Sequence, residues 1–210
     1  MKKVLIITYY WPPAGGPGVQ RWVKFVKYLR DFGIEPIIYI PENPTYPILD
    51  PHIAADIPED LTLLKTKIFE PYALASLFSK EKTQKISAGI IPTKKPSLLD
   101  KLLLWIRGNL FIPDARVLWV RPSVKYLSEY LTEHPIDTII TTAPPHSLHL
   151  IGLRLKEKFP SLRWIADFRD PWTTIGYHSQ LRLTKRSARK HLAMERIVLQ
   201  TADTLIVTSP

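Results

Sequence analysis

Three short segments hold the residue types that bind ligands and move protons. They are a glycine-rich turn at residues 11–21, a Pro-Pro-His turn at 143–147 and the run Asp-Phe-Arg-Asp-Pro-Trp at 167–172. Each follows an apolar stretch, so each is expected where a buried strand ends. Parallel strands present their carboxyl ends at one edge of a sheet, and the three segments would converge there into a site.

The glycine-rich turn suits an anion, most simply a phosphate. Gly15, Gly16 and Gly18 precede an amphipathic segment, so main-chain N–H groups and the positive end of a helix would point at one place. The alternative is a tight turn that needs glycine for its backbone alone. A dinucleotide fingerprint fits poorly, because Arg21 stands where its third glycine belongs. The Gly-Lys-Ser/Thr sequence of a P-loop is missing.

The Pro-Pro-His turn places His146 just before a predicted helix whose expected N-cap is Ser147. A histidine there can donate to a sugar hydroxyl or a phosphate, or shuttle a proton. The alternative is a surface residue in a proline turn. His149 follows three residues later, but two histidines without a third ligand do not make a metal site, so we predict no metal.

In the third segment, Asp167 and Asp170 flank Arg169, and Trp172 follows. Two carboxylates and a guanidinium can orient a polyol by hydrogen bonds, and an indole offers a stacking face for a sugar ring. The alternative is an internal Arg–Asp pair and an Asp-Pro turn over a buried tryptophan.

The rest of the pattern predicts an α/β fold with a doubly wound, mostly parallel, Rossmann-like sheet. Strands are expected at 4–9, 34–40, 61–65, 137–142, 162–168 and 204–208, and helices at 19–32, 71–78, 98–112, 119–131, 147–158 and 181–202. We expect 42–59 to be irregular and 79–97 to be a flexible loop. Because no helix follows the last strand, we also expect the natural chain to continue beyond residue 210.

Composition limits the class of protein. The net charge of +10 favours anionic partners, and the lack of cysteine fits a reducing compartment such as the cytoplasm. No apolar stretch is long enough to span a membrane. Cations and Leu/Trp side chains within 80–121 suit peripheral contact with a membrane surface, and the alternative is that the 98–112 helix packs on the sheet.

In combination, these motifs resemble the N-terminal half of family 4 glycosyltransferases, which have the two-domain GT-B fold. The residues that carry the resemblance are the 11–21 turn, Ile-Pro-Asp at 112–114 with Trp119, Thr-Ala-Pro-Pro-His at 142–146 and the 167–172 run. The resemblance implies an N-terminal, Rossmann-like, acceptor-binding domain at 1–210. It also implies a C-terminal donor-binding domain that this sequence lacks, so the chain alone is expected to be inactive.

The resemblance further implies metal-independent, retaining transfer of a sugar from a nucleotide-sugar, with no other cofactor. The acceptor would be a glycan, commonly linked to polyprenyl diphosphate, at the inner face of the cell membrane, in polysaccharide or glycolipid biosynthesis. Gly15 and Gly16 would face the donor diphosphate. The catalytic residues would be His146 and Asp170, and the acceptor-binding residues would be Trp11, Arg21, Arg169 and Trp172.

One departure from the family pattern concerns the histidine. Many members place it directly after the fourth main strand, where this chain has Ala143 and Pro144. Two alternatives stay open. A nucleotide-dependent sugar oxidoreductase or epimerase domain is disfavoured by the missing Tyr-x-x-x-Lys pair, and a basic lipid- or nucleic-acid-binding module lacks a recognition motif. We expect no nucleic-acid partner.

Overall fold

A computed structural model describes residues 1–70 and 98–208, and the predicted helix at 71–78 and flexible loop at 79–97 lie outside these residues. Six parallel strands form one sheet in the order β3-β2-β1-β4-β5-β6. The strands are β1 (Lys2–Ile7), β2 (Ile34–Pro41), β3 (Thr62–Thr66), β4 (Thr138–Ala143), β5 (Arg163–Phe168) and β6 (Thr204–Val207). The predicted doubly wound sheet is confirmed, and its order reverses between β1 and β4.

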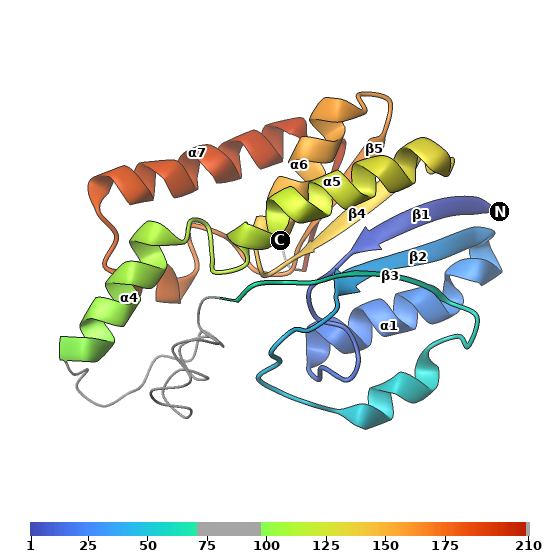
Figure 1. Ribbon diagram of the computed structural model, residues 1–210, viewed down its shortest axis with the longest axis horizontal. Helices are drawn as coiled ribbons and strands as arrows, with labels where there is room; N and C mark the ends of the chain where they lie inside the picture. The colour runs from blue at the N-terminus through green and yellow to red at the C-terminus, as the bar shows by residue number, and fades with distance from the viewer. Residues whose placement is uncertain (71–97, 209–210) are drawn as a thin grey trace.

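Helices cover both faces of the sheet (Figure 1). They are α1 (Pro17–Leu29), α4 (Leu98–Leu110), α5 (Val117–Glu133), α6 (Ser147–Lys158) and α7 (Lys185–Thr201), with short 3₁₀ helices η1 (Arg30–Phe32), η2 (Pro51–Asp56) and η3 (Gly176–Leu181). Figure 1 shows α1 on one face and α5, α6 and α7 on the other. The helix α4 lies at the end of the molecule toward which the strands point. This arrangement explains why the inner strands β1, β2, β4 and β5 are largely buried, because both of their faces are covered, whereas the edge strands β3 and β6 are more exposed.

Two hydrophobic clusters hold the layers together. Leu5 and Ile7 of β1 face the cluster under α5 and α6, which includes Trp119 and Trp164. Ile6, between them in sequence, faces the cluster under α1. Alternate residues of one strand therefore enter opposite cores, as the two-residue repeat of a strand requires.

Several predicted boundaries are wrong by a few residues. The strand β1 ends at Ile7 rather than at residue 9, and α1 begins at Pro17 rather than at 19, because proline suits the first helical position. The last helix begins at Lys185, not 181, where the Thr184 hydroxyl accepts from the Ser187 amide at 3.1 Å. Residues 51–56, expected to be irregular, form η2.

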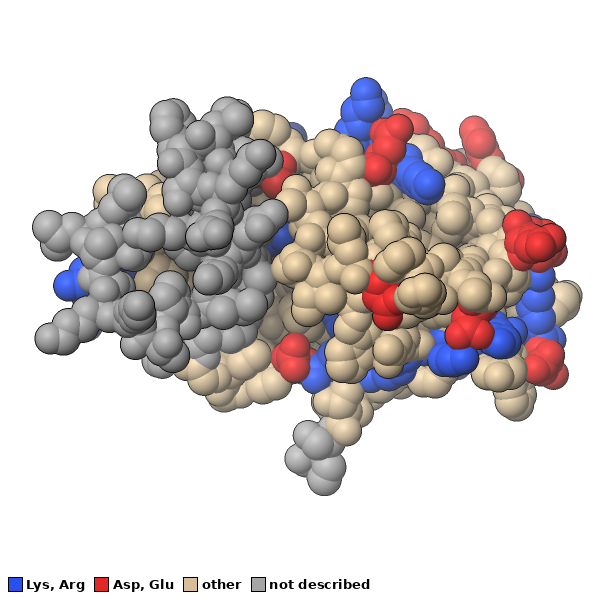
Figure 2. Space-filling view, turned by 90° about the horizontal axis from the view of Figure 1, so that it is seen from below, with Lys and Arg blue, Asp and Glu red and all other residues tan. Residues whose placement is uncertain are grey.

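The face that carries α1 and η2 bears basic and acidic side chains next to one another (Figure 2). Lys24 and Lys27 of α1 both pair with Asp56 of η2, at 2.7 and 2.6 Å. Farther along, Arg30 pairs with Glu35 and Asp60. Charges on this face are therefore largely neutralised locally. Within residues 1–70 and 98–208, no helix has the length and hydropathy needed to cross a membrane.

Candidate functional site

The three sequence-predicted segments meet at the carboxyl edge of the sheet, next to the point where the strand order reverses. The guanidinium of Arg169, just after β5, donates from Nε to the Ala143 carbonyl at 3.1 Å and from Nη2 to the Pro144 carbonyl at 2.8 Å. Its third nitrogen lies against Gly18 of the glycine turn. The predicted convergence is confirmed, and Arg169 is the side chain that joins all three segments.

The three glycines of the turn have different roles. The Gly15 amide donates to the Ile48 carbonyl at 3.0 Å, and a Cβ atom there would lie 3.0 Å from the Asp50 Cβ. Gly15 is therefore committed to the loop that follows β2, and its N–H is not available to the predicted diphosphate. Gly16 has φ of 111°, where a side chain would be strained, and nothing crowds its Cβ position.

Gly18 admits the Arg169 guanidinium to the amino end of α1. A Cβ atom at position 18 would lie 1.4 Å from Arg169 Nη1, so any other residue would have to displace this side chain. The helix has no acidic residue in its first turn and no side-chain cap. A cation and the positive end of a helix dipole thus share one place, and both attract an anion. Burial lowers the pKa of the guanidinium, although Asp167 and Asp170 oppose this.

Asp167, one of the two carboxylates expected to orient a polyol, is instead the buried acceptor of this edge, as in the alternative of an internal Arg–Asp pair. It is fully buried, and its carboxylate pairs with Arg21 and accepts from the Trp22 indole at 3.0 Å and from the Thr142 hydroxyl at 2.7 Å. The carboxylate thereby ties α1 to the ends of β4 and β5. Arg21 is held by this ion pair. Asp167 is the last residue but one of β5, and a carboxylate at the buried end of a strand could have indicated this structural role.

His146 is the N-cap residue of α6 and is 5% exposed. Neither ring nitrogen has a hydrogen-bond partner among the described residues. The predicted N-cap, Ser147, is instead the first residue of the helix. Its amide and hydroxyl both donate to Asp114 at 2.9 Å, so a carboxylate from the segment before α5 caps α6.

Trp172 covers His146 rather than facing solvent. The two rings stack with centroids 4.9 Å apart and an angle of 8° between their planes, and the indole is 1% exposed. Its N–H donates to His191 Nδ1 at 3.2 Å. The prediction that Trp172 offers an exposed stacking face is therefore wrong. The alternative of a buried tryptophan holds, because its ring packs on the ring of His146 inside the protein. Trp11, also predicted to bind acceptor, is equally buried, in the core under α1.

The buried imidazoles are held neutral. Burial lowers the pKa of His146 to about 4; the nearby His191, His178 and Arg169 act in the same direction, and Asp114 opposes them. Burial also lowers the pKa of His191 to about 4. A neutral imidazole carries one donor and one acceptor nitrogen, which is what a sugar hydroxyl needs. No group of residues that could hold a metal ion occurs in the described part of the chain.

Asp170, the second predicted catalytic residue, is half-buried in the loop after β5. Its side chain has no hydrogen bond to any described residue, in contrast to Asp167. The structure therefore leaves Asp170 free to contact a ligand, and its catalytic role stays a prediction.

A second buried network fixes the loops around the site. The Glu70 carboxylate pairs with Arg116 at 3.0 Å and accepts from the Tyr9 hydroxyl at 2.7 Å and from the Thr45 amide at 2.8 Å. Arg116 also donates to the Tyr9 hydroxyl at 3.2 Å. These contacts join the segments that follow β1, β2 and β3 with the start of α5, so the edge around the site is held together by polar side chains.

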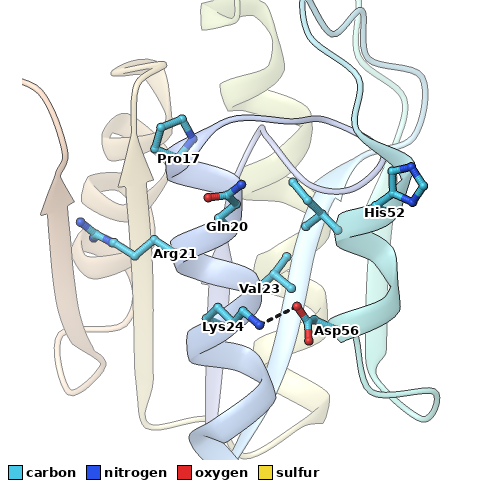
Figure 3. A pocket seen from close by; sticks show the side chains of 8 residues that line it. Pro17, Gln20, Arg21, Val23, Lys24, His52 and Asp56 are labelled. Atoms are coloured by element: carbon cyan, nitrogen blue, oxygen red, sulfur yellow. Dashed lines mark ion pairs between the residues drawn. The ribbon is translucent and has the colours of Figure 1, made fainter.

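A groove of about 560 Å³ opens between α1 and η2, beside the glycine turn (Figure 3). Figure 3 shows the side chains of Gln20 and His52 at this groove and the Lys24–Asp56 ion pair across it, whereas Arg21 points the other way, toward the strands. The groove begins at Pro17, the first residue of α1.

Comparison with known proteins identifies no family. No family model matches the chain, and no curated protein matches it. Among solved structures, a protein described as a UDP-N-acetylglucosamine 2-epimerase from Listeria monocytogenes is similar over 97% of this chain and 38% of its own, with 12% identity and a TM-score of 0.45. The UDP-GlcNAc 2-epimerase from Neisseria meningitidis, bound to UDP-GlcNAc, is similar over 98% and 46%, with 11% identity and a TM-score of 0.42. The chain spans less than half the length of either protein, and at these values neither likeness carries a functional argument.

Proposed function

We propose that the chain is the acceptor-side domain of a metal-independent, retaining glycosyltransferase that uses a nucleotide-sugar to extend a glycan. The observation that carries this proposal is the Arg169 guanidinium lodged at the amino end of α1. Two positive groups converge there at the carboxyl edge of the sheet, which is where α/β sheets bind ligands. A diphosphate satisfies both groups. The sequence motifs that resemble family 4 glycosyltransferases lie on the same edge.

The role of each residue in the proposed site follows from whether its polar groups already have hydrogen-bond partners in the described part of the protein. The diphosphate meets Arg169 and the turn at Gly16 and Gly18, while Gly15 shapes the turn. His146, which is neutral and has no hydrogen-bond partner among the described residues, receives a hydroxyl of the acceptor. Asp170 orients or deprotonates the same substrate. Arg21 and Trp172 have structural roles beside the site. Arg21 is paired with Asp167, and Trp172 is buried.

The proposal is tested by titrating the 210-residue chain with pyrophosphate and with UDP, followed by amide NMR. The amides of Gly16 and Gly18 should shift in a saturable way, and Arg169→Gln should weaken binding by about tenfold or more, since a charge-assisted contact is lost. Arg163→Gln is the matched control, because Arg163 is exposed at the opposite end of β5. Equal affinity in wild type and Arg169→Gln would contradict the proposal.

The class of reaction is tested on the complete gene product. A glycosyltransferase needs both a nucleotide-sugar and an acceptor, and it should keep its activity in a metal chelator. An epimerase would convert the nucleotide-sugar with no acceptor present, and an oxidoreductase would require a nicotinamide cofactor. Either outcome would replace the transferase proposal.

We also propose that the protein works at the cytoplasmic face of a membrane and contacts it peripherally. The predicted contact region at 80–121 is described only from residue 98, and there α4 exposes Leu102, Trp105 and Leu110. Asn109 of α4 accepts from the Thr184 amide at 2.8 Å, which joins this helix to the start of α7. The outer side of α7 carries four exposed cations, none ion-paired with a described residue: Lys185, Arg186, Arg189 and Lys190. An anionic lipid surface complements such a row of charges.

A further inference from the structure

The groove between α1 and η2 is separate from the proposed anion site but lies directly beside it, at the first residues of α1. Pro17 lines the groove and is followed directly by Gly18, which contacts Arg169. At the other end, Lys24 and Asp56 bridge the two walls. The walls are also fixed to the glycine turn, because the Asp50 amide donates to the Pro13 carbonyl at 2.9 Å. The groove is therefore a preformed extension of the site, within the usual size of a small-molecule pocket.

The chemistry of the lining selects a class of ligand. Gln20, His52 and Lys24 offer donors, while Asp56, Gln20 and His52 offer acceptors. Hydroxyl groups, which donate and accept at once, match such a mixture. Between these polar groups, Pro17 and Ile53 present apolar surface for the C–H faces of a ring.

Other ligand classes fit less well. A phosphate or a carboxylate would face the Asp56 carboxylate, and the cations beside it are already paired: Lys24 and Lys27 with Asp56, and Arg21 with Asp167. A nucleobase binds best between aromatic side chains. Among the described residues that line the groove, the small ring of His52 is the one aromatic group, so a nucleobase would be poorly held. A lipid chain would leave the polar groups unpaired.

We infer that this groove binds one uncharged, hydroxyl-rich sugar ring, seated against Gln20, His52 and Asp56. The inference rests on the proposed function, in which the ring is a unit of the glycan acceptor and reaches the reaction centre past Pro17. Asp56 is then a sugar-binding residue as well as the partner of two lysines, each of its oxygens keeping a lone pair for a hydroxyl.

The experiment titrates the 210-residue chain with the methyl glycosides of glucose, galactose and N-acetylglucosamine, observed by NMR. At least one glycoside should shift the Gln20 side-chain amide and the His52 ring in a saturable way. Asp56→Ala should weaken that binding by about tenfold, the usual cost of one hydrogen bond to a charged group. Asp60→Ala is the matched control, since Asp60 is an exposed acid of the same segment that pairs with Arg30 instead. Gln20→Ala, at an exposed helix position, repeats the test without touching the lysine pairs.

Three results would overturn the inference: no saturable shift at Gln20 and His52 with any glycoside, unchanged affinity in both Asp56→Ala and Gln20→Ala, or stronger shifts there with uridine or inorganic phosphate. Its failure is distinguishable from failure of the proposed function. Pyrophosphate reports separately, through Gly16 and Gly18. Glycoside binding without pyrophosphate binding would leave the sugar groove standing and remove the nucleotide-sugar proposal.

Discussion

The Arg169 guanidinium fills the space that any side chain at Gly18 would need: a Cβ atom at position 18 would lie 1.4 Å from Nη1. Arg169 is fixed there by two carbonyl oxygens at the end of β4. The glycine and the arginine are 151 positions apart in the sequence. A residue larger than glycine at position 18 would displace the Arg169 side chain. Their contact sets a positive charge at the amino end of α1, where we propose that the anion binds.

Gly18→Ala should weaken anion binding while the chain still folds. The new methyl group must push Arg169 Nη1 aside, and this breaks at least one of its hydrogen bonds, at a cost of about 1–2 kcal/mol of unfolding free energy. Pyrophosphate affinity, measured by NMR, should fall about tenfold or more. Gly176→Ala is the control, because nothing crowds a Cβ atom there. Tight pyrophosphate binding by Gly18→Ala would show that the anion binds elsewhere.

Asp167→Asn should destabilise the fold much more than Asp170→Asn. An amide at position 167 cannot accept from Arg21, Trp22 and Thr142 together, and it leaves the Arg21 charge without its partner. Loss of a buried charged acceptor costs about 2–4 kcal/mol. Asp170→Asn should change the unfolding free energy by less than about 0.5 kcal/mol, because the Asp170 side chain has no hydrogen bond to a described residue. Urea unfolding measures both. Similar losses for the two variants would mean that Asp167 is not the structural hub.

Much of the fold follows from the sequence because strands and helices here are local patterns. The run Leu5–Ile7 is apolar on both faces, and this alone predicts a parallel strand covered on both sides. The meeting of the three loops followed from the same logic, since parallel strands share a carboxyl edge.

The roles of single side chains at the site depended on long-range contacts that no local pattern encodes. The family resemblance places Gly15 against the ligand, but its amide donates to the carbonyl of Ile48, in the loop after β2. The sequence predicts that Trp172 faces a sugar, but His146, from another loop, stacks on it. Neither partner is close in sequence, so composition and spacing could not choose between the exposed and the buried alternatives.

The cations of α7 should be needed for binding to anionic vesicles. Like charges three and four residues apart repel, and cations in the first turn oppose the helix dipole, so a negative surface relieves both effects. Each cation near such a surface contributes about 1 kcal/mol, so reversing Arg186, Arg189 and Lys190 to glutamate should weaken vesicle binding by about 100-fold or more. Co-sedimentation with phosphatidylglycerol vesicles at low salt measures this.

The matched control for that test reverses Lys2, Lys3 and Lys125, three exposed cations outside both α7 and the 80–121 region. It should reduce binding far less, because the total charge changes equally but the α7 row stays intact. The α7 variant should fold at least as well as wild type, since glutamate suits the first turn of a helix. Equal losses in both variants, or tighter binding to duplex DNA than to vesicles, would refute the assignment of this surface.

Stability should fall as the pH drops from about 6.5 toward 4. Burial holds the pKa of His146 and His191 at about 4 in the folded protein, below the 6.5 of an unfolded chain. Below pH 6.5 the unfolded state therefore binds protons that the folded state does not, and stability present above 6.5 is lost at about 1.4 kcal/mol per pH unit for each histidine. His149, with a pKa also lowered by burial, acts in the same sense. The pKa of Asp56 is held at about 2 by its two lysines. Carboxylates of this kind therefore lose their contribution to stability only below about pH 4.

Urea unfolding between about pH 6.5 and 4 measures the dependence of the unfolding free energy on pH. His146→Gln and His191→Gln should each reduce this slope by about 1.4 kcal/mol per pH unit, the equivalent of one proton. A flat profile in the wild type between pH 6.5 and 4 would mean that the imidazole cluster is hydrated and charged in solution, and the neutral acceptor proposed at His146 would then have to be abandoned.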